Sequence, residues 1–275
     1  MRTDELIIEA GMTERHYWQD LWRFRELLYF LAWRDILVRY KQTVIGVAWA
    51  VLRPVLTMIV FTVVFGKLAN LPSEGNAPYA IMVFAAVLPW QFFSTAISEA
   101  GSSLTSNASM ISKVYFPRLI IPTSTIIVNL VDFVISSLIL AALMGWYGYA
   151  PSFRILTVPL FLLLAFTAAM SAGVWIAALN VRYRDFRYIV PFVVQFGLYV
   201  SPVGFSINVI PEQWRLLYSL NPMVGVIEGF RWGILGGGAQ LYWPSVWLSF
   251  TLVVALGVTG VMYFRKTEKS FADVI

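Results

Sequence analysis

Residues Ile120 to Trp146 read IIPTSTIIVNLVDFVISSLILAALMGW, a long apolar run with one charged side chain, Asp132. An α-helix rises ~1.5 Å per residue, so this run is long enough to cross a hydrocarbon core of ~30 Å. Lipid offers the backbone no hydrogen-bond partner, and a crossing segment must satisfy its own N–H and C=O groups. The run therefore predicts a membrane-spanning helix.

Similar stretches recur along the rest of the chain. They are Val44–Phe65, Tyr79–Ala100, Ile155–Asn180, Ile189–Ile207 and Val246–Phe264. Hydrophobic residues make up 59% of the 275 residues and charged residues only 13%, which excludes an ordinary soluble domain. We predict an all-α membrane protein, a single domain over residues 1–275 with six transmembrane helices.

Basic residues are distributed unevenly over the connections between these spans. The two terminal segments and the loops after the second and fourth spans hold most of the 20 lysines and arginines. The opposite loops hold only Lys67, Arg154, Arg215 and Arg231. Because loops rich in Lys and Arg stay in the cytoplasm, both termini are predicted to be cytoplasmic. Topology thus explains the net charge of +5, and no nucleic-acid partner is expected.

An amphipathic helix is expected before the first span, from about Tyr17 to Tyr40. Its apolar residues recur at i, i+3 and i+4: Trp18, Leu21, Trp22, Leu28, Tyr29, Ala32, Trp33 and Ile36. Trp, Leu and Arg on one helix suit the headgroup layer of a membrane, so we predict an interface helix that contacts membrane lipids. The alternative is a helix that packs against soluble protein.

The segment from Asn208 to Tyr242 is apolar but broken. Pro211 suits the first position of a helix, and Asn221-Pro222 interrupts that helix. A second helix runs from about Met223 to the glycines at 236–238. These pieces reach only ~15 and ~20 Å, too short to cross. We predict a re-entrant outer helical hairpin between the fifth and sixth spans.

The sequence offers little for enzymatic chemistry. It has no cysteine, and its one histidine, His16, precedes the first span. It lacks the P-loop, H-E-x-x-H and G-x-S-x-G patterns and any acidic metal cluster. We expect no catalytic residue, no metal and no cofactor in this chain. A membrane-embedded glycosyl- or acyltransferase is a weaker alternative, because it would need paired carboxylates or a histidine at the membrane surface.

Charged side chains inside the spans mark candidate functional positions. Arg53 lies in the first span, Asp132 lies one helical turn from Asn129 in the third, and Glu99 is near the end of the second. A charge at membrane depth costs ~2.5–3.5 kcal/mol by insertion scales, so such residues face a cavity or one another. Arg53 either meets an anionic substrate or pairs with Asp132.

Aromatic residues make up 16% of the chain. Their flat faces can stack on sugars, and we name Trp49, Trp90, Trp175 and Tyr199 as candidate glycan-channel residues because they are less clearly at span ends. The alternative for any aromatic residue is a place in the belt at the membrane interface.

Several runs, in order along the chain, resemble the ABC-2-type permeases that export polysaccharides. These runs are Arg39–Ala50, Leu52–Pro54, Ile111–Arg118, Arg184–Tyr188, Ser201–Val203, Leu220–Met223 and Glu228–Arg231. The chain resembles most the O-antigen exporters of Gram-negative bacteria. Capsule and teichoic-acid permeases are similar, and ABC-2 exporters of lipids or drugs share the architecture.

The resemblance implies a homodimer in the bacterial inner membrane, joined by two separate ATPase subunits that bind ATP and Mg²⁺. It implies an undecaprenyl-pyrophosphate-linked polysaccharide as cargo. Residues 106–117 would form a coupling helix, with Ser106, Asn107, Met110, Lys113, Tyr115 and Phe116 facing the ATPase. Residues 209–236 would form periplasmic gate helices, with Trp214, Tyr218, Phe230 and Trp232. Arg25, Arg34, Arg39 and Arg53 are candidates for the pyrophosphate, because guanidinium binds phosphate bidentately. For the arginines of the interface helix the alternative is anchoring to anionic lipids together with a role in topology.

Overall fold

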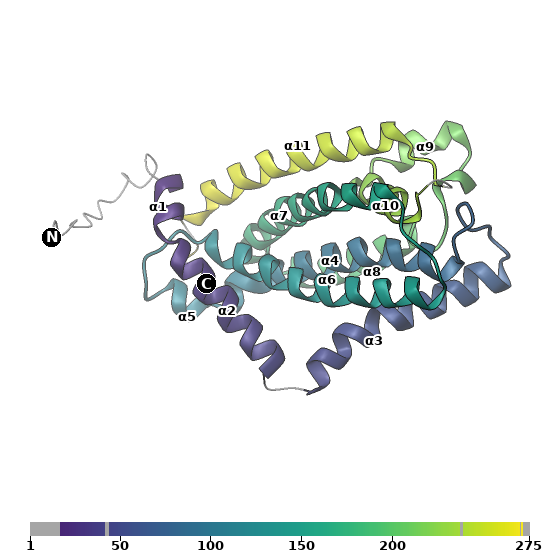
Figure 1. Ribbon diagram of the computed structural model, residues 1–275. Coiled ribbons are helices and arrows are strands. Elements are labelled where there is room, and N and C mark those ends of the chain that lie inside the picture. Colours follow the sequence, from purple (N-terminus) through teal and green to yellow (C-terminus); the bar gives the residue numbers. More distant parts are fainter. Residues whose placement is uncertain (1–16, 42–43, 237–238, 270, 272–275) are drawn as a thin grey trace.

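The computed structural model describes residues 17–41, 44–236, 239–269 and 271, and within this part the fold is entirely helical. His16, two of the three glycines at 236–238 and the basic residues before Tyr17 lie outside the described residues. The helices run roughly side by side, with α1, α2, α5 and the described C-terminal residues gathered at one end and α9 at the other (Figure 1). We call the first the basic end and the second the far end.

Five segments are long and apolar enough to cross a membrane, which confirms a multi-pass membrane protein. They are Ala48–Leu68, within α3 (Val44–Phe61) and the π-helical η2 (Thr62–Leu68), α4 (Tyr79–Ser106), α6 (Ile120–Trp146), η3 with α7 (Phe153–Thr157 and Val158–Arg182), and α11 (Trp243–Glu268). The π-helical end of the first span is not foreshadowed by the sequence pattern.

The predicted fifth span, Ile189–Ile207, is wrong in its bounds. The helix there, α8, covers Phe186–Val200 and is too short for ~30 Å at ~1.5 Å per residue. Ser201 is followed by Pro202, and the residue before a proline is driven out of the helical region. Ser201 is accordingly extended, with φ −87° and ψ 153°. The chain then turns through Gly204 and Phe205 before the short η4 (Ile207–Val209).

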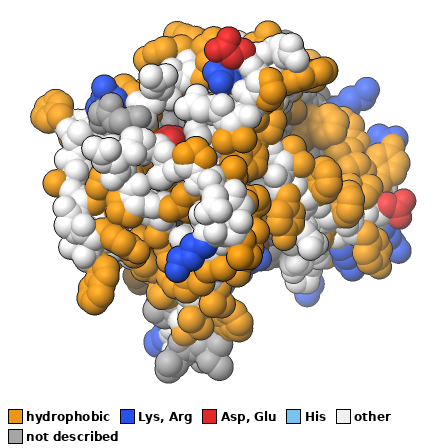
Figure 2. Space-filling view, turned by 90° about the vertical axis from the view of Figure 1, so that its right-hand side faces the viewer, with side chains coloured by type: hydrophobic (Ala, Val, Ile, Leu, Met, Phe, Trp, Pro, Cys, Tyr) orange, Lys and Arg blue, Asp and Glu red, His pale blue; other side chains and the backbone are white. Residues whose placement is uncertain are grey.

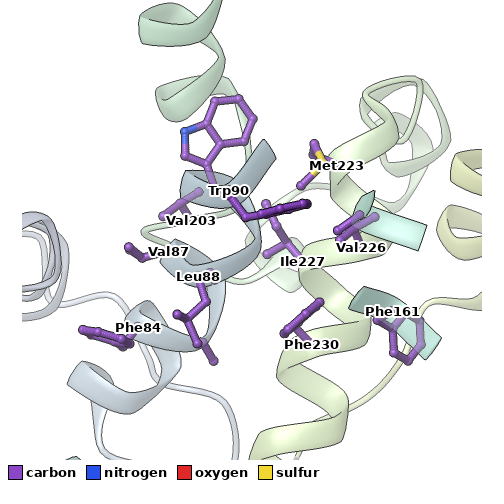
Figure 3. Close-up of a cluster of buried hydrophobic side chains, with 14 of the residues drawn as sticks. Phe84, Val87, Leu88, Trp90, Phe161, Val203, Met223, Val226, Ile227 and Phe230 are labelled. Carbon is purple, nitrogen blue, oxygen red and sulfur yellow. The ribbon is translucent and has the colours of Figure 1, made fainter. Parts of the chain in front are cut away.

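Helix α4 is the centre of the bundle. In its most apolar 18-residue stretch 83% is buried, whereas the corresponding stretches of the other spans are 11–33% buried. Its neighbours are α3, α6, α7, α8 and α10. In Figure 3 side chains of α10 lie against those of α4 and α7: Phe84, Val87, Leu88, Trp90, Phe161, Met223, Val226, Ile227 and Phe230. A span buried in this way meets protein rather than lipid on most sides.

The predicted interface helix is present but divided. Helix α1 (Tyr17–Arg23) and helix α2 (Arg25–Lys41) meet at Phe24. The expected apolar stripe splits between two surroundings: Ala32 is buried in the bundle, whereas Trp22 and Tyr29 are 71% and 70% exposed. Leu31, which the predicted stripe did not include, is buried beside Ala32. One side of this segment therefore packs on protein, and its large aromatic side chains other than Tyr17 are partly or largely exposed.

At the far end two short helices occupy the region of the predicted hairpin. They are α9 (Glu212–Tyr218) and α10 (Pro222–Leu235). The Asn221 side chain caps α10 by accepting a hydrogen bond from the Met223 N–H at 3.0 Å, and Gly236 ends it with φ +70°. Helix α9 is mostly exposed and α10 almost wholly buried. Apolar side chains spread over the far end between a few charged ones (Figure 2).

Glycines let α10 approach its neighbours closely. A methyl group at Gly225 would lie 2.5 Å from the Ser245 carbonyl oxygen of α11, and one at Gly229 would lie 2.1 Å from the Phe161 ring of α7. The Gly225 N–H donates to the Ser249 hydroxyl at 3.1 Å. Such contacts leave no room for a side chain at either position.

We predict that Gly225→Ala destabilises the purified protein by roughly 1–3 kcal/mol, the usual cost of overpacking. Thermal unfolding in detergent should show a lower midpoint. Gly145→Ala is the matched control, because nothing lies within 4 Å of the added methyl and alanine favours a helix. Equal midpoints for the two variants would contradict the packing argument.

Candidate functional site

A polar cluster joins α2 to two central helices. Arg39 of α2 lies between Glu99 of α4 and Asp132 of α6, with Nη2–Oε2 and Nη1–Oδ2 distances of 2.5 and 2.6 Å. The three side chains are 26–34% exposed. Because the residues come from three elements, their contacts fix the position of α2 against the bundle.

Two polar neighbours complete this cluster. The buried Asn129 donates from Nδ2 to Glu99 Oε2 at 2.9 Å, and the Tyr40 hydroxyl donates to Asp132. The sequence brings Asn129 and Asp132 to one helix face, as predicted, but the suggested partner was Arg53. The structure pairs Asp132 with Arg39 instead. The signal for this was Arg39 itself, a charge that interrupts an apolar stripe.

The carboxylates determine the electrostatics of Arg39. Burial opposes its charge, but Glu99 and then Asp132 outweigh it and raise the pKa of Arg39 above its usual value. Arg39 therefore stays cationic, with its charge balanced inside the protein. Such an arginine is well suited to holding helices together and poorly suited to attracting an external phosphate.

A cavity of about 280 Å³ opens beside the cluster, between α2, α3, α4 and α6. Arg39, Glu99 and Asp132 form one part of its wall, and Trp49 and Arg53 of α3 form another. Trp49 is 59% exposed, and Arg53 is exposed as well. The cavity thus offers a cation, an aromatic face and carboxylates within one small volume.

The remaining predicted pyrophosphate residues lie on the surface of α2. Arg34 forms an ion pair with Asp35 at 2.8 Å, and Arg25 lies over the Trp22 ring at 5.1 Å. In the described part of the chain no carboxylate pairs with Arg25 or Arg53. Of the predicted set, these two keep their charge uncompensated.

The predicted glycan aromatics do not form one surface. Tyr199 is 61% exposed and lies near Phe61, and Trp49, in the wall of the cavity, is also exposed. Trp90, by contrast, is only 6% exposed and lies in the apolar core (Figure 3). Trp175 stacks on Tyr263 of α11 at 5.5 Å. In this arrangement only Trp49 and Tyr199 are open to a ligand.

A second charged cluster lies at the far end, around the fully buried Arg231 of α10. Its Nη1 is 3.4 Å from Glu74 Oε1 and 3.8 Å from Glu228 Oε1. Its guanidinium also donates to the carbonyl oxygens of Val203 and Phe205 at 2.9 and 2.7 Å. Arg231 thereby ties α10 to the turn after α8 and to the loop before α4.

Glu228 belongs to this cluster, but its surroundings disfavour the charged form of its carboxyl group. Burial, followed by the neighbouring Glu74 carboxylate, raises the pKa of Glu228 to about 8, and Arg231 works against that shift. Burial thus favours the neutral form of the Glu228 carboxyl group. The Glu74 carboxylate is the acidic group nearer to Arg231, at 3.4 Å against 3.8 Å for Glu228.

The predicted gate residues, on α9 and α10 at the far end, differ widely in exposure. Phe230 is fully buried, whereas Trp214 of α9 is 54% exposed. The Tyr218 ring lies near Phe205, with centroids 6.4 Å apart. Trp232 lies under the Arg154 guanidinium at 4.9 Å and meets Trp243 edge-on. Tyr218, Phe230 and Trp232 thus contact neighbouring parts of the protein while Trp214 is exposed, and the four do not form one patch.

At the basic end the predicted coupling helix, residues 106–117, is too long. Helix α4 continues to Ser106, and α5 covers only Ala108–Ile111. The β-branched Val114 and the proline at position 117 disfavour a longer helix. Asn107 stands between the two helices and donates from Nδ2 to the Ser103 carbonyl oxygen at 2.8 Å.

The side chains of this segment have mixed exposure. Ser106 and Lys113 are exposed and Tyr115 is 43% exposed, whereas Phe116 is only 4% exposed and Met110 packs on the same core. A cavity of about 830 Å³ borders the segment. Among the described residues no group of three histidine or acidic side chains could hold a metal.

Comparison with known proteins places this sequence in a family. The model of the ABC-2 type transporter family matches residues 26–235. The O-antigen export system permease protein RfbA of Myxococcus xanthus is 30% identical over 78% of this chain and 82% of its own length. RfbA of Klebsiella pneumoniae is 26% identical over 91% of this chain and 95% of its own length. The capsule polysaccharide export inner-membrane protein CtrC of Neisseria meningitidis is 24% identical over 91% and 95%. The chain belongs to the ABC-2 type transporter family.

Proposed function

We propose that this chain is the membrane-spanning subunit of an ATP-driven exporter of polysaccharide carried on undecaprenyl pyrophosphate, of the O-antigen class. Two copies would form the channel, with two separate ATPase subunits on the cytoplasmic side. The observation that carries the proposal is the likeness to O-antigen export permeases over most of the chain. A cavity that combines Arg53 with Trp49 supports it, because a lipid-linked glycan offers both a phosphate and a sugar.

The size of the cavity supports a channel made by two copies. About 280 Å³ lies at the lower end of small-molecule sites, enough for a head group and too little for a polymer. The first span is only 11% buried, so most of it is free to meet lipid or a second copy. A wider path between two first spans would let the polymer pass Trp49 and Tyr199.

The energy source would be a separate protein. The sequence has no P-loop, which excludes the usual phosphate cradle of ATPases from this chain. Exposed Lys113 and Tyr115 project from a segment at the basic end, where the positive-inside rule places the cytoplasm. We assign this segment to contact with the ATPase, and α9 with α10 to the periplasmic gate.

Within the arginine set the geometry favours Arg53 and Arg25 for the pyrophosphate. Arg53 faces the cavity, and Arg25 lies on the exposed side of the interface helix, where a lipid head group approaches. Arg39 and Arg34 already have carboxylate partners. Capsule export is the second candidate, since CtrC is similar over a comparable length.

Deletion of the gene from its host tests the proposed function. We expect surface polysaccharide to disappear and undecaprenyl-linked polymer to accumulate on the cytoplasmic side, because synthesis continues while export stops. Gel analysis of surface glycan and mass spectrometry of extracted lipid would measure both. Loss of capsule or teichoic acid instead would select that cargo, and an unchanged surface with no trapped polymer would overturn the proposal.

We predict different behaviour for two arginine substitutions. Arg53→Gln should reduce export about tenfold or more while the protein remains folded, because a charge-assisted phosphate contact is lost. Arg53→Lys should retain part of the activity. Arg39→Gln should instead lower thermal stability, because it leaves Glu99 and Asp132 without their cation.

The ratio of export to folded protein, measured in membranes that contain equal amounts of each variant, distinguishes the two arginines. Normal export by both Arg53 variants would remove Arg53 from the substrate path. A fully stable Arg39→Gln protein would show that the ion cluster does not hold α2.

Tyr115→Ala tests the contact with the ATPase. Tyr115 is exposed, so its removal should leave the fold intact but weaken ATP-driven export. Phe116→Ala is the contrasting variant, because Phe116 is buried and its loss should cost roughly 3–5 kcal/mol of stability. Export and thermal unfolding are measured on the same preparations. If Tyr115→Ala exports normally, the segment is not the contact.

A further inference from the structure

Three segments that are far apart in the sequence meet at the basic end. The cavity of about 830 Å³ is lined by the start of α1 at Tyr17 and Asp20, by residues 111–118, and by the last turn of α11 with Lys269. Residues 112–118, which overlap the segment 106–117 assigned above to contact with the ATPase, contain no helix among themselves. Backbone hydrogen bonds attach residues 112–114 to α5, and contacts with the other two segments add to these.

Glu268, the last residue of α11, provides the most specific of these contacts. The backbone N–H of Arg118 donates to Glu268 Oε1 at 2.8 Å. The Arg118 guanidinium donates to the backbone oxygen of the same residue. A backbone N–H away from water needs an acceptor, and here a side chain supplies it instead of a helix. Glu268 is thus hydrogen-bonded to the segment close to the residue at which the segment leads into α6.

Apolar packing reinforces this attachment. Phe271 is 1% exposed and meets the Phe264 ring edge-on, with centroids 5.3 Å apart. Phe116 belongs to the same buried cluster as these two rings and Tyr17. Arg265 lies over the Tyr17 ring at 4.7 Å. The end of α11 is therefore fastened both to the segment 112–118 and to α1.

Helix α11 connects this point with the far end. It runs the length of the bundle in Figure 1, and at its other end it packs against α10 through Gly225. A helix of 26 residues spans ~39 Å and transmits displacement along its axis. A shift of residues 112–118 would consequently reach α10 through one rigid element.

We propose that Glu268 is a positioning residue for coupling: it holds residues 112–118 against α11, so that movement imposed by the ATPase is carried to the gate helix α10. This inference rests on the proposed function. It adds the C-terminal end of α11 to the coupling machinery. An ATPase can bias the permease only through contacts that differ between its states, and the Glu268–Arg118 contact attaches the moving segment to the rest of the protein.

The test uses the complete complex of permease and ATPase in liposomes loaded with undecaprenyl-linked glycan. The readout is the number of ATP molecules hydrolysed per glycan lipid transferred. Glu268→Ala removes the acceptor, and we expect this ratio to rise about tenfold as hydrolysis continues without transfer. Glu268→Gln keeps an oxygen that can accept from the Arg118 N–H and should stay near the wild-type ratio.

Thr259→Ala is the matched control on the exposed face of α11, where the hydroxyl only bonds its own helix. A merely structural role for Glu268 would lower hydrolysis and transfer together and leave their ratio unchanged, and that result would overturn the proposal. An equal rise for Glu268→Gln and Glu268→Ala would also contradict it. Failure of the wild-type complex to transfer glycan would count against the proposed function instead.

A cross-link covers the case in which Glu268→Ala does not assemble. The chain has no cysteine, so the double substitution Arg118→Cys with Glu268→Cys introduces the only two cysteines of the permease. A short, cleavable thiol reagent should restore the wild-type ratio, and cleavage should abolish the restoration. A ratio that does not respond to the cross-link would exclude the Glu268–Arg118 contact as the attachment.

Discussion

Charge that must be neutralised inside an apolar bundle decides how the helices of this protein meet. Near each end an arginine lies between two acidic side chains: Arg39 between Glu99 and Asp132, and Arg231 between Glu74 and Glu228. A buried charge without a partner costs several kcal/mol, so each cluster restricts the bundle to arrangements that keep the partners together. Helix α4 serves both clusters, since Glu99 lies near one of its ends and the loop that carries Glu74 leads into the other.

The two clusters differ in how firmly they are held. Arg231 is fully buried and also bonded to backbone oxygens, whereas the groups around Arg39 are about one-quarter to one-third exposed beside a cavity. Water can replace protein partners around Arg39 at lower cost than around Arg231. The far end is thus the more rigid part of this structure, and the basic end keeps polar groups accessible. In an exporter that receives its substrate from the cytoplasm, the substrate would meet the accessible polar groups of the basic end first and the more rigid far end afterwards.

Much of the fold followed from hydrophobic length and proline position, because lipid leaves a spanning backbone few alternatives. The Asn221-Pro222 break was predicted correctly, for both residues act locally at the start of α10. The errors arose where tertiary contacts decide. Pro202 shortened the fifth span, and the segment after Ser106 made one helical turn rather than a full helix. The partner of Asp132 could not be predicted from residue spacing, since Arg39 reaches it from a separate helix. The hydrogen bond between Arg118 and Glu268 could not be predicted either, because it joins residues 150 positions apart.

The most direct measurement places the purified chain in liposomes, first alone and then with its ATPase, and follows delivery of undecaprenyl-linked glycan to the opposite leaflet. The account predicts no nucleotide hydrolysis and no delivery by the chain alone, and delivery that requires both ATP and the ATPase in the pair. Hydrolysis by the lone chain, or a complex that hydrolyses ATP and moves only free lipid, would contradict it.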